Sequence, residues 1–245
     1  MNKILTVLFA LLLIQLLVVK KTFGGEGEVK DCFERLNRAT FALNMGLDKI
    51  IFKPISKGYR KLPSPIRTGT SNALNNLSNL ITIPNNLLQG DFGSAANNSA
   101  RLIINTTLGI AGIFDPANSF GFQKRDKEDF GQSLGVMGVG EGCYIVLPVL
   151  GPSTVRDTVG SLIAFNGGDV WHNITVRDDE EYVREFKESD YWVSRVTSGV
   201  DFRAKNLEAF DAMEKNSVDL YATVRSLYLQ DRKKKINNSS AKTEA

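Results

Sequence analysis

The sequence predicts a mainly α-helical fold with a glycine-rich central segment and little or no β-sheet. Apolar residues recur at three-to-four spacing over most of the chain, which is the period of an amphipathic helix. The only sustained β-like run is Tyr144–Val149. Pro148 and Pro152 interrupt pairing there, so we expect an extended segment rather than a central strand. Of the 245 residues, 42% are hydrophobic and 23% are charged, which is the composition of a folded protein.

Residues 1–24 are expected to be an export signal or an uncleaved membrane anchor. The apolar run from Ile4 to Val19 follows the basic residue Lys3. At about 1.5 Å per residue this run reaches about 24 Å, short of the hydrocarbon core of about 30 Å. A short apolar run behind a basic residue favours an export signal, whereas Lys20 and Lys21 leave the anchor open. Either segment places the remaining chain outside the cytoplasm or on a membrane.

Helices are expected through the first half of the body. Pro63-Ser64-Pro65 breaks the first helical pattern, and Gly90 is suited to end a turn that a proline begins. The expected elements, in order, are a helix over Phe33–Ile51, a helix with Ile66, Leu74, Leu77 and Ile81 along one stripe, a short turn from Pro84 to Gly90, and a helix over Ser94–Leu108.

The second half changes character. Glycine is frequent from Gly109 to Gly151, after which Ser153 is expected to be the N-cap of a helix that ends at Ala164. The stretch 165–200 is ambiguous, and helical periodicity returns over Asp201–Lys235. The polar residues 236–245 are expected to be disordered. We therefore predict one domain over residues 25–235, between the N-terminal segment 1–24 and the tail 236–245.

Charge and composition exclude several classes of function. The formal net charge of +3 arises from the lysines of residues 1–24, so the body has no broad basic face and nucleic acid is not expected as a partner. Cys32 and Cys143 allow one disulfide at most. The single histidine, His172, leaves most zinc and iron sites without a second imidazole, so no metal and no cofactor is predicted.

One candidate catalytic motif is present, and its context argues against it. Gly131–Gly135 matches the G-x-S-x-G pattern of serine hydrolases, in which the serine, here Ser133, follows a buried strand and begins a helix. The preceding residues 124–130 are strongly charged, and the following residues are rich in glycine. The base would be His172, which is more typical of a packed residue beside Trp171. Residues 178–181 are all acidic but lack calcium-ligand spacing. We therefore expect no catalytic site.

Many short motifs, in one order, resemble the MlaA (VacJ) family of outer-membrane proteins from Gram-negative bacteria. The similarity runs from Asn37 to Gln230 and so covers nearly the whole body. Its clearest motifs are Asn37-Arg38, Phe41, Asn44, Leu47-Asp48, Lys53-Pro54, Gly58-Tyr59, Leu88-Gln89-Gly90, Arg101, Asn105-Thr106-Thr107-Leu108-Gly109, Phe114-Asp115, Glu128-Asp129-Phe130-Gly131-Gln132, Gly138-Val139-Gly140, Tyr144, Leu147-Pro148, Gly151-Pro152-Ser153, Arg156-Asp157, Tyr221, Arg225 and Tyr228.

The resemblance implies a ring-shaped bundle of amphipathic helices lying in the membrane interface, in the periplasmic leaflet of the outer membrane. It further implies that the chain is not an enzyme. Such a protein offers mislocalised phospholipids a central channel from the outer leaflet toward a soluble periplasmic lipid carrier, often beside a trimeric porin. Family members are typically lipoproteins. Cys32 stands where the family usually has proline, so we do not equate it with a lipidated cysteine.

Within this family reading, the glycine-rich segment is our predicted border of the lipid path. Glycine leaves room where side chains would block a narrow wall. The predicted residues are Gly135, Gly138, Gly140, Gly142, Ser153 and Arg156. Arg156 could contact a headgroup or pair with Asp157. Two other functions stay open, a structural envelope protein that transports nothing and a serine lipid hydrolase that uses Ser133.

Overall fold

The computed structural model describes residues 29–176 and 186–243 and confirms a mainly helical fold. The predicted segment 1–24 and the acidic residues 178–181 lie outside the described residues. Along the chain the elements are α2 (Glu34–Leu47), the π-helix η1 (Asp48–Phe52), α3 (Lys53–Arg60), α4 (Ser64–Leu88), α5 (Phe92–Thr107), α6 (Pro116–Ser119), α7 (Phe130–Val136), β1 (Tyr144–Leu147), β2 (Gly151–Thr154), α8 (Val155–Ile163), the π-helix η2 (Ala164–Gly168), α9 (Val170–Thr175), α10 (Glu188–Lys205), α11 (Leu207–Asn216) and α12 (Leu220–Thr243).

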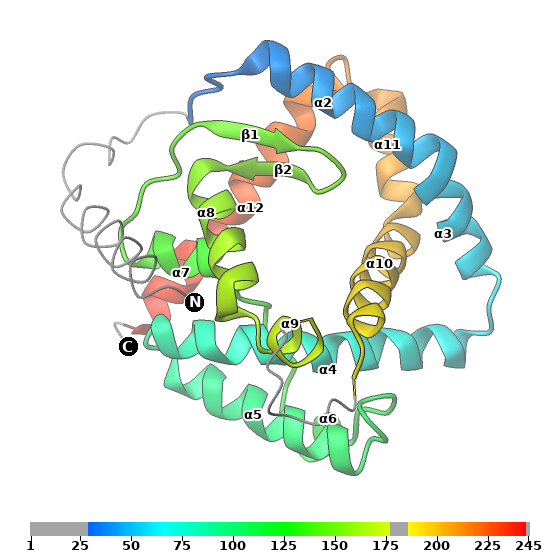
Figure 1. Cartoon of the computed structure of the whole chain (residues 1–245), viewed down its shortest axis with the longest axis vertical. Coiled ribbons are helices and arrows are strands. Elements are labelled where there is room, and N and C mark those ends of the chain that lie inside the picture. The colour runs from blue at the N-terminus through cyan, green and yellow to red at the C-terminus, as the bar shows by residue number, and fades with distance from the viewer. Residues whose placement is uncertain (1–28, 177–185, 244–245) are drawn as a thin grey trace.

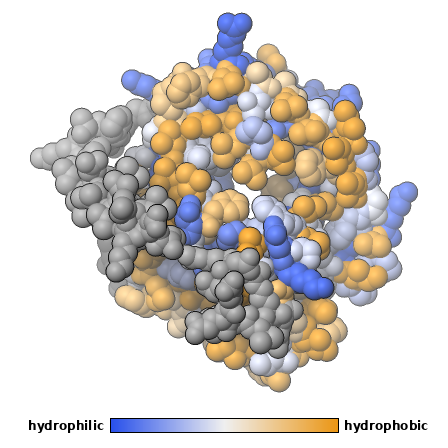
Figure 2. All heavy atoms as spheres, in the orientation of Figure 1, coloured by the Kyte–Doolittle hydropathy of each residue, from blue (hydrophilic) through white to orange (hydrophobic). Residues whose placement is uncertain are grey.

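These elements form a ring, as the family resemblance implied. In Figure 1, α2, α3, α10 and α4 follow one another around an open centre, and the β-hairpin and α8 close the ring on the other side. The space-filling view in Figure 2 is hollowed at the same place. Helix α5 lies outside α4, and α12 runs behind the hairpin and α8. The chain therefore surrounds a central opening instead of packing around a central core.

Helix α4 corrects the predicted turn at Pro84. The helix continues through this proline to Leu88, although proline removes one backbone hydrogen bond. Packing against α5 holds the turn in place, because the amide of Asn98 donates to Asn86 Oδ1 at 2.9 Å. Gly90, with φ of 76°, then ends the helix as the sequence predicted. Interhelical contact outweighs the cost of one missing backbone bond.

The extended segment expected at Tyr144 is one half of a short hairpin. Strands β1 and β2 pair antiparallel, with Tyr144 opposite Thr154 and Leu147 opposite Gly151. The predicted N-cap Ser153 is wrong by one residue, because Ser153 lies in β2. The cap is Thr154, whose hydroxyl accepts from the amide of Asp157 at 3.2 Å. An N-cap side chain reaches the amide three residues on, which from Thr154 is the amide of Asp157.

Two asparagines of α2 hold this hairpin. The Asn37 amide donates to the Tyr144 carbonyl at 3.0 Å, and its oxygen accepts from the Val146 amide at 2.9 Å. Asn44, two turns further along the helix, makes the same pair of bonds to Leu147 and Val149 at 2.9 and 2.7 Å. Each side chain replaces a missing neighbouring strand at the edge of the sheet.

The C-terminal helices follow the predicted periodicity and extend beyond it. Helix α12 continues to Thr243, so residues 236–243 are helical where disorder was expected. Contacts made near its end explain the extension. Arg232 is 7% exposed and pairs with Asp129 and Asp157, and the side chain of Ile236 reaches Gly135 of α7. Polar composition alone indicated disorder, but the ring anchors this segment.

Burial in the described residues is inverted relative to a water-soluble protein. Asparagine, serine, aspartate and arginine dominate the buried positions, whereas large apolar side chains are exposed around the ring. Figure 2 shows these apolar residues over much of the visible surface. Examples are Leu36, Ile50, Phe92, Ile103 and Val196. No described helix is both long enough and apolar enough to cross a bilayer.

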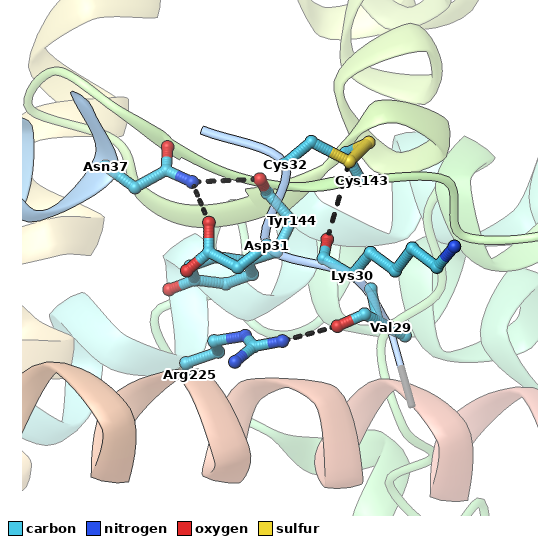
Figure 3. Close-up of a disulfide and its surroundings, with 8 residues drawn as sticks. All are labelled: Val29, Lys30, Asp31, Cys32, Asn37, Cys143, Tyr144 and Arg225. Atoms are coloured by element: carbon cyan, nitrogen blue, oxygen red, sulfur yellow. Dashed lines mark hydrogen bonds between the residues drawn. A yellow bond between two sulfur atoms is a disulfide. The ribbon is translucent and has the colours of Figure 1, made fainter. Parts of the chain in front are cut away.

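A disulfide and a backbone hydrogen bond join residues 29–32 to the segment that leads into the β-hairpin, beside a cluster of aromatic rings (Figure 3). Cys32 is bonded to Cys143, just before β1, with a Cα–Cα distance of 5.6 Å. The Tyr144 amide donates to the Lys30 carbonyl at 2.9 Å. The rings of Tyr144 and Tyr221 then meet edge to face at 6.1 Å. We call residues 29–32, the hairpin, α7, α8 and α12 the packed side.

Candidate functional site

The central opening has an apolar chamber of about 950 Å³ beside α4. Its walls come from α4, from the loop after α5, and from the N-terminal half of α10, and Trp171 of α9 completes them. The apolar residues on these walls are Pro65, Ile66, Ala73, Leu74, Leu77, Ile113, Phe114, Trp171 and Val193. A chamber of this size and character is suited to hydrocarbon chains.

A second, polar chamber of about 360 Å³ continues from the first. Four residues belong to both walls, namely Leu74, Leu77, Trp171 and Ser194. The remaining lining is mostly polar or charged and includes Lys127, Glu128, Asp129, Gln132, Asp169, Arg195, Ser198, Arg232 and Lys235. The two chambers share this part of their walls, so an apolar space and a charged space adjoin each other along α4. We call α4, α9, α10 and the segments 113–115 and 124–127 the cavity side.

Helix α4 separates the chambers from the outer layer of the ring. Its predicted apolar stripe, Ile66, Leu74, Leu77 and Ile81, lines the two chambers rather than a closed core. The opposite face is polar and meets α5, where the Asn76 amide donates to Thr106 Oγ1 at 2.8 Å. A helix whose polar face is buried and whose apolar face borders a cavity is suited to contact an apolar ligand in that cavity.

Helix α9 is held across the opening by Asp169. This carboxylate is 2% exposed, accepts from the Trp171 amide at 2.9 Å as an N-cap, and pairs with Arg195 of α10. The indole of Trp171 donates to Ser194 Oγ at 3.0 Å. Both contacts join α9 to α10, so the boundary between the two chambers has a fixed geometry.

The segment after α6 brings cations to the same space. Lys127 lines the polar chamber and also a small polar cavity between α4 and α5, where Lys124 and Arg125 are its neighbours. Burial lowers the pKa of Lys127, and the positive charges of Lys124 and Lys205 lower this pKa further. Sequence reasoning missed these lysines as site residues because the run 124–130 served only to exclude a buried strand. Two lysines three residues apart were the available signal.

The residues predicted to border the lipid path lie on the packed side. A side chain at Gly135 would meet Ile236 of α12, and one at Gly142 would meet Val155. Gly138 is at a turn with φ of 87°, and Gly140 lies in the connection from α7 to β1. Ser153 Oγ is 3.0 Å from Thr158 Oγ1. None of these residues lines either chamber as described, and their part in a lipid path stays a prediction.

Arg156 adopts the ion-pair alternative. It is 4% exposed, and its Nε donates to Asp157 Oδ1 at 3.0 Å, while Glu141 is 3.8 Å away. Asp157 also accepts from Arg232 at 2.9 Å and from the Tyr228 hydroxyl at 2.5 Å. Burial acts to raise the pKa of Asp157, but the charges of Arg232 and Arg156 bring it below its usual value. The network therefore joins α7, α8 and α12.

Ser133 is placed as a structural hydroxyl. It is 2% exposed, donates to Asn85 Oδ1 at 2.6 Å, and accepts from the Gln89 amide at 3.0 Å. His172 packs between the rings of Phe165 and Tyr191, with centroid distances of 5.6 and 5.0 Å. The hydrogen bonds of Ser133 thus connect α7 to α4, and His172 is among aromatic rings.

Comparisons with known proteins agree on one family. The family model described as MlaA lipoprotein matches residues 29–235. The intermembrane phospholipid transport system lipoprotein MlaA of Haemophilus influenzae is 30% identical over 86% of this chain and 81% of its own. The Escherichia coli protein of the same name is 32% identical over 82% of this chain and 76% of its own. A solved structure described as "Structural basis for maintenance of bacterial outer membrane lipid asymmetry" matches with a TM-score of 0.67 at 30% identity, covering 84% of this chain and 99% of that one.

Proposed function

Because this chain belongs to the MlaA lipoprotein family, we propose that it is a phospholipid transport protein of the bacterial outer membrane. It takes phospholipids that are misplaced in the outer leaflet and passes them through the central opening toward a soluble periplasmic carrier. The relatives named as lipoproteins of an intermembrane phospholipid transport system support this role. The task is to move a molecule and requires no bond to be made or broken.

The pair of adjoining chambers carries the proposal. A phospholipid has apolar chains and a charged headgroup, and moving the headgroup through hydrocarbon is costly. The apolar chamber offers a place for the chains, and the polar chamber offers a place for the headgroup. Because Leu74, Leu77, Trp171 and Ser194 belong to both walls, one molecule can occupy the two chambers at once.

The apolar outer surface supports a position within one leaflet. Amphipathic helices that lie in the interface plane bury their apolar faces among the acyl chains. The exposed apolar residues of α2, η1, α5 and α10 are suited to such a position, with the polar interhelical contacts hidden inside the ring. We place the ring in the periplasmic leaflet, with a trimeric porin beside it, as the family resemblance suggests.

The test measures phospholipid in the outer leaflet of cells that produce the chain, lack it, or produce a blocked variant. Thr197→Trp puts a bulky ring into the apolar chamber, and Val196→Trp is its matched control on the outer face of the same helix. We expect outer-leaflet phospholipid to rise with Thr197→Trp to the level of cells without the chain. Val196→Trp should leave it low. Normal transport by Thr197→Trp would contradict a path through this chamber.

Two further variants separate the remaining predictions. Gly138→Leu combined with Gly140→Leu should block lipid removal while the protein still fractionates with outer membranes, if the glycine-rich segment borders the path. Ser133→Ala should leave transport unchanged, because its hydroxyl only joins α7 to α4. Loss of a lipase activity in Ser133→Ala would instead support the hydrolase alternative.

A further inference from the structure

The walls around segment 124–127 carry more positive than negative charge. The small polar cavity between α4 and α5 is lined by Arg101, Lys124, Arg125 and Lys127 against Asp115 and Asp126. The polar chamber adds Arg195, Arg232 and Lys235 against Glu128, Asp129 and Asp169. Lys127 lines both spaces, so the excess positive charge faces the path of the proposed cargo.

Lys124 and Lys127 differ from most of the other cations around these spaces, because no carboxylate pairs with them in the described part of the chain. Arg101 pairs with Asp115 at 2.8 Å, and Lys205 pairs with Asp201 at 2.7 Å. Arg195 has Asp169, and Arg232 has Asp129 and Asp157. In the described part of the chain, the ammonium groups of Lys124 and Lys127 make neither an ion pair nor a hydrogen bond. Together with Arg125, which also has no carboxylate partner among the described residues, they are free to bind a ligand.

Their surroundings show that both lysines lie in a hollow. Both side chains are exposed to solvent, yet burial is the largest cause that lowers the pKa of each. Their mutual repulsion acts in the same direction. A side chain that is accessible to water, but has protein atoms on most sides, is one that lines a cavity. An anion between the two ammonium groups would relieve this repulsion.

We propose that Lys127, which borders both the polar chamber and the small polar cavity, and Lys124, which lines that small cavity, bind the phosphate group of a phospholipid and give the chain a preference for phospholipids of net negative charge. This inference rests on the proposed transport function. A headgroup amine would bring its own positive charge to an already cationic wall, whereas a glycerol headgroup would not. The adjoining apolar chamber favours an anion that carries acyl chains over free phosphate.

The test measures lipid uptake by the purified full chain in detergent. The donors are phosphatidylcholine vesicles that contain either phosphatidylglycerol or phosphatidylethanolamine. We expect the wild-type chain to prefer phosphatidylglycerol and Lys124→Gln with Lys127→Gln to lower that preference about tenfold, equivalent to one charge-assisted hydrogen bond. The control is Lys233→Gln with Lys234→Gln, exposed lysines of α12 that line neither chamber. The control should keep the wild-type preference.

Each other outcome has a definite meaning. Equal uptake of both lipids by the wild-type chain overturns the inference and leaves the transport function standing. A preference that survives in the double variant also overturns the inference. Binding of inorganic phosphate that the double variant loses, without a change in lipid preference, assigns the lysines to free phosphate and overturns the headgroup role. A wild-type chain that takes up neither lipid overturns the transport function together with the inference.

Discussion

The packed side and the cavity side both bury charge, but they use it in opposite ways. On the packed side, the buried guanidinium groups of Arg156 and Arg232 both face the carboxylate of Asp157. On the cavity side, Lys127 lines the polar chamber and Lys124 lines the small cavity next to it, and neither has a carboxylate of its own in the described part of the chain. Matched charges hold helices together, whereas unmatched charges next to a cavity are available to a ligand. The comparison distinguishes the residues that maintain the ring from those that we expect to touch the cargo.

Glycines also help to hold the packed side together, because they let its helices approach closely. A side chain at Gly160 of α8 would lie 2.3 Å from the backbone nitrogen of Gly131 in α7. Gly168 similarly leaves room for the ring of Phe130. These glycines allow α7 and α8 to approach closely. The side chains of Asp157 and Arg232 lie next to this contact at Gly131. Gly160 and Gly168 therefore serve close packing on the packed side, together with Gly131 of the glycine-rich segment.

The largest expected effect comes from removing the central carboxylate of the packed side. Asp157→Ala leaves Arg156 and Arg232 buried without it, and the loss of one partner from a buried ion pair costs about 3–5 kcal/mol. We expect the free energy of unfolding to fall by this amount in denaturant titrations in detergent. Glu208→Ala, which breaks the exposed pair with Arg60, should lower the free energy of unfolding far less, because solvent screens an exposed ion pair. Equal losses would contradict the comparison.

The carboxylate of Asp157 also makes the free energy of unfolding depend on pH in the acid range. The pKa of Asp157 is lower in the folded chain than in the unfolded chain, so its contribution is complete above the unfolded pKa of about 3.9. That contribution is lost as the pH falls through the folded pKa. Asp157→Asn should remove this part of the acid dependence, which is measured as a shallower fall in unfolding free energy below about pH 4.

The disulfide of the packed side gives the next effect. Cys32 and Cys143 are 111 residues apart, and a bridge that closes a long loop contributes about 2–4 kcal/mol by restricting the unfolded chain. Cys32→Ser with Cys143→Ser should lower the unfolding midpoint by a corresponding amount. Dithiothreitol should lower the wild-type midpoint equally and leave the double variant unchanged. If reduction destabilises both proteins, the loss does not come from this bridge.

A smaller effect tests the close approach of α7 and α8. Gly160→Ala forces backbone apart, and overpacking of this kind costs about 1–3 kcal/mol. Gly199→Ala is the matched control, since Gly199 is a helical glycine of α10 with open space around it. That substitution should stabilise the chain by about 0.5–1 kcal/mol. A neutral Gly160→Ala would mean that the two helices have room to separate.

Sequence reasoning gave the fold class and the family, and it predicted the lipid path from the frequency of glycine. Helical periodicity was enough for α2 and α4, because amphipathic stripes are local. The pairing of Arg232 with Asp129 joins residues 103 apart, and no local pattern specifies it. The chambers depend on where α9 and α10 lie relative to α4, which is equally non-local. Glycine frequency could not distinguish close packing from an open wall, because glycine permits both.

The smallest expected effect is the change in unfolding free energy when Lys127 on the cavity side is replaced. Lys127 has a lowered pKa in the folded chain, so folding is disfavoured while this lysine is charged, and the cost fades as the pH rises toward the unfolded pKa of about 10.4. Lys127→Gln should therefore raise the unfolding free energy at neutral pH only slightly, because solvent screens this exposed lysine, and should remove the gain at alkaline pH.

The matched variant Lys233→Gln on α12 should leave stability unchanged, since this lysine is exposed and lines neither chamber. A residue that weakens the fold when it is present, and whose removal weakens ligand preference, is maintained for function. Loss of stability in Lys127→Gln would instead give this lysine the same structural role as the arginines of the packed side, and the contrast between the two sides would no longer hold.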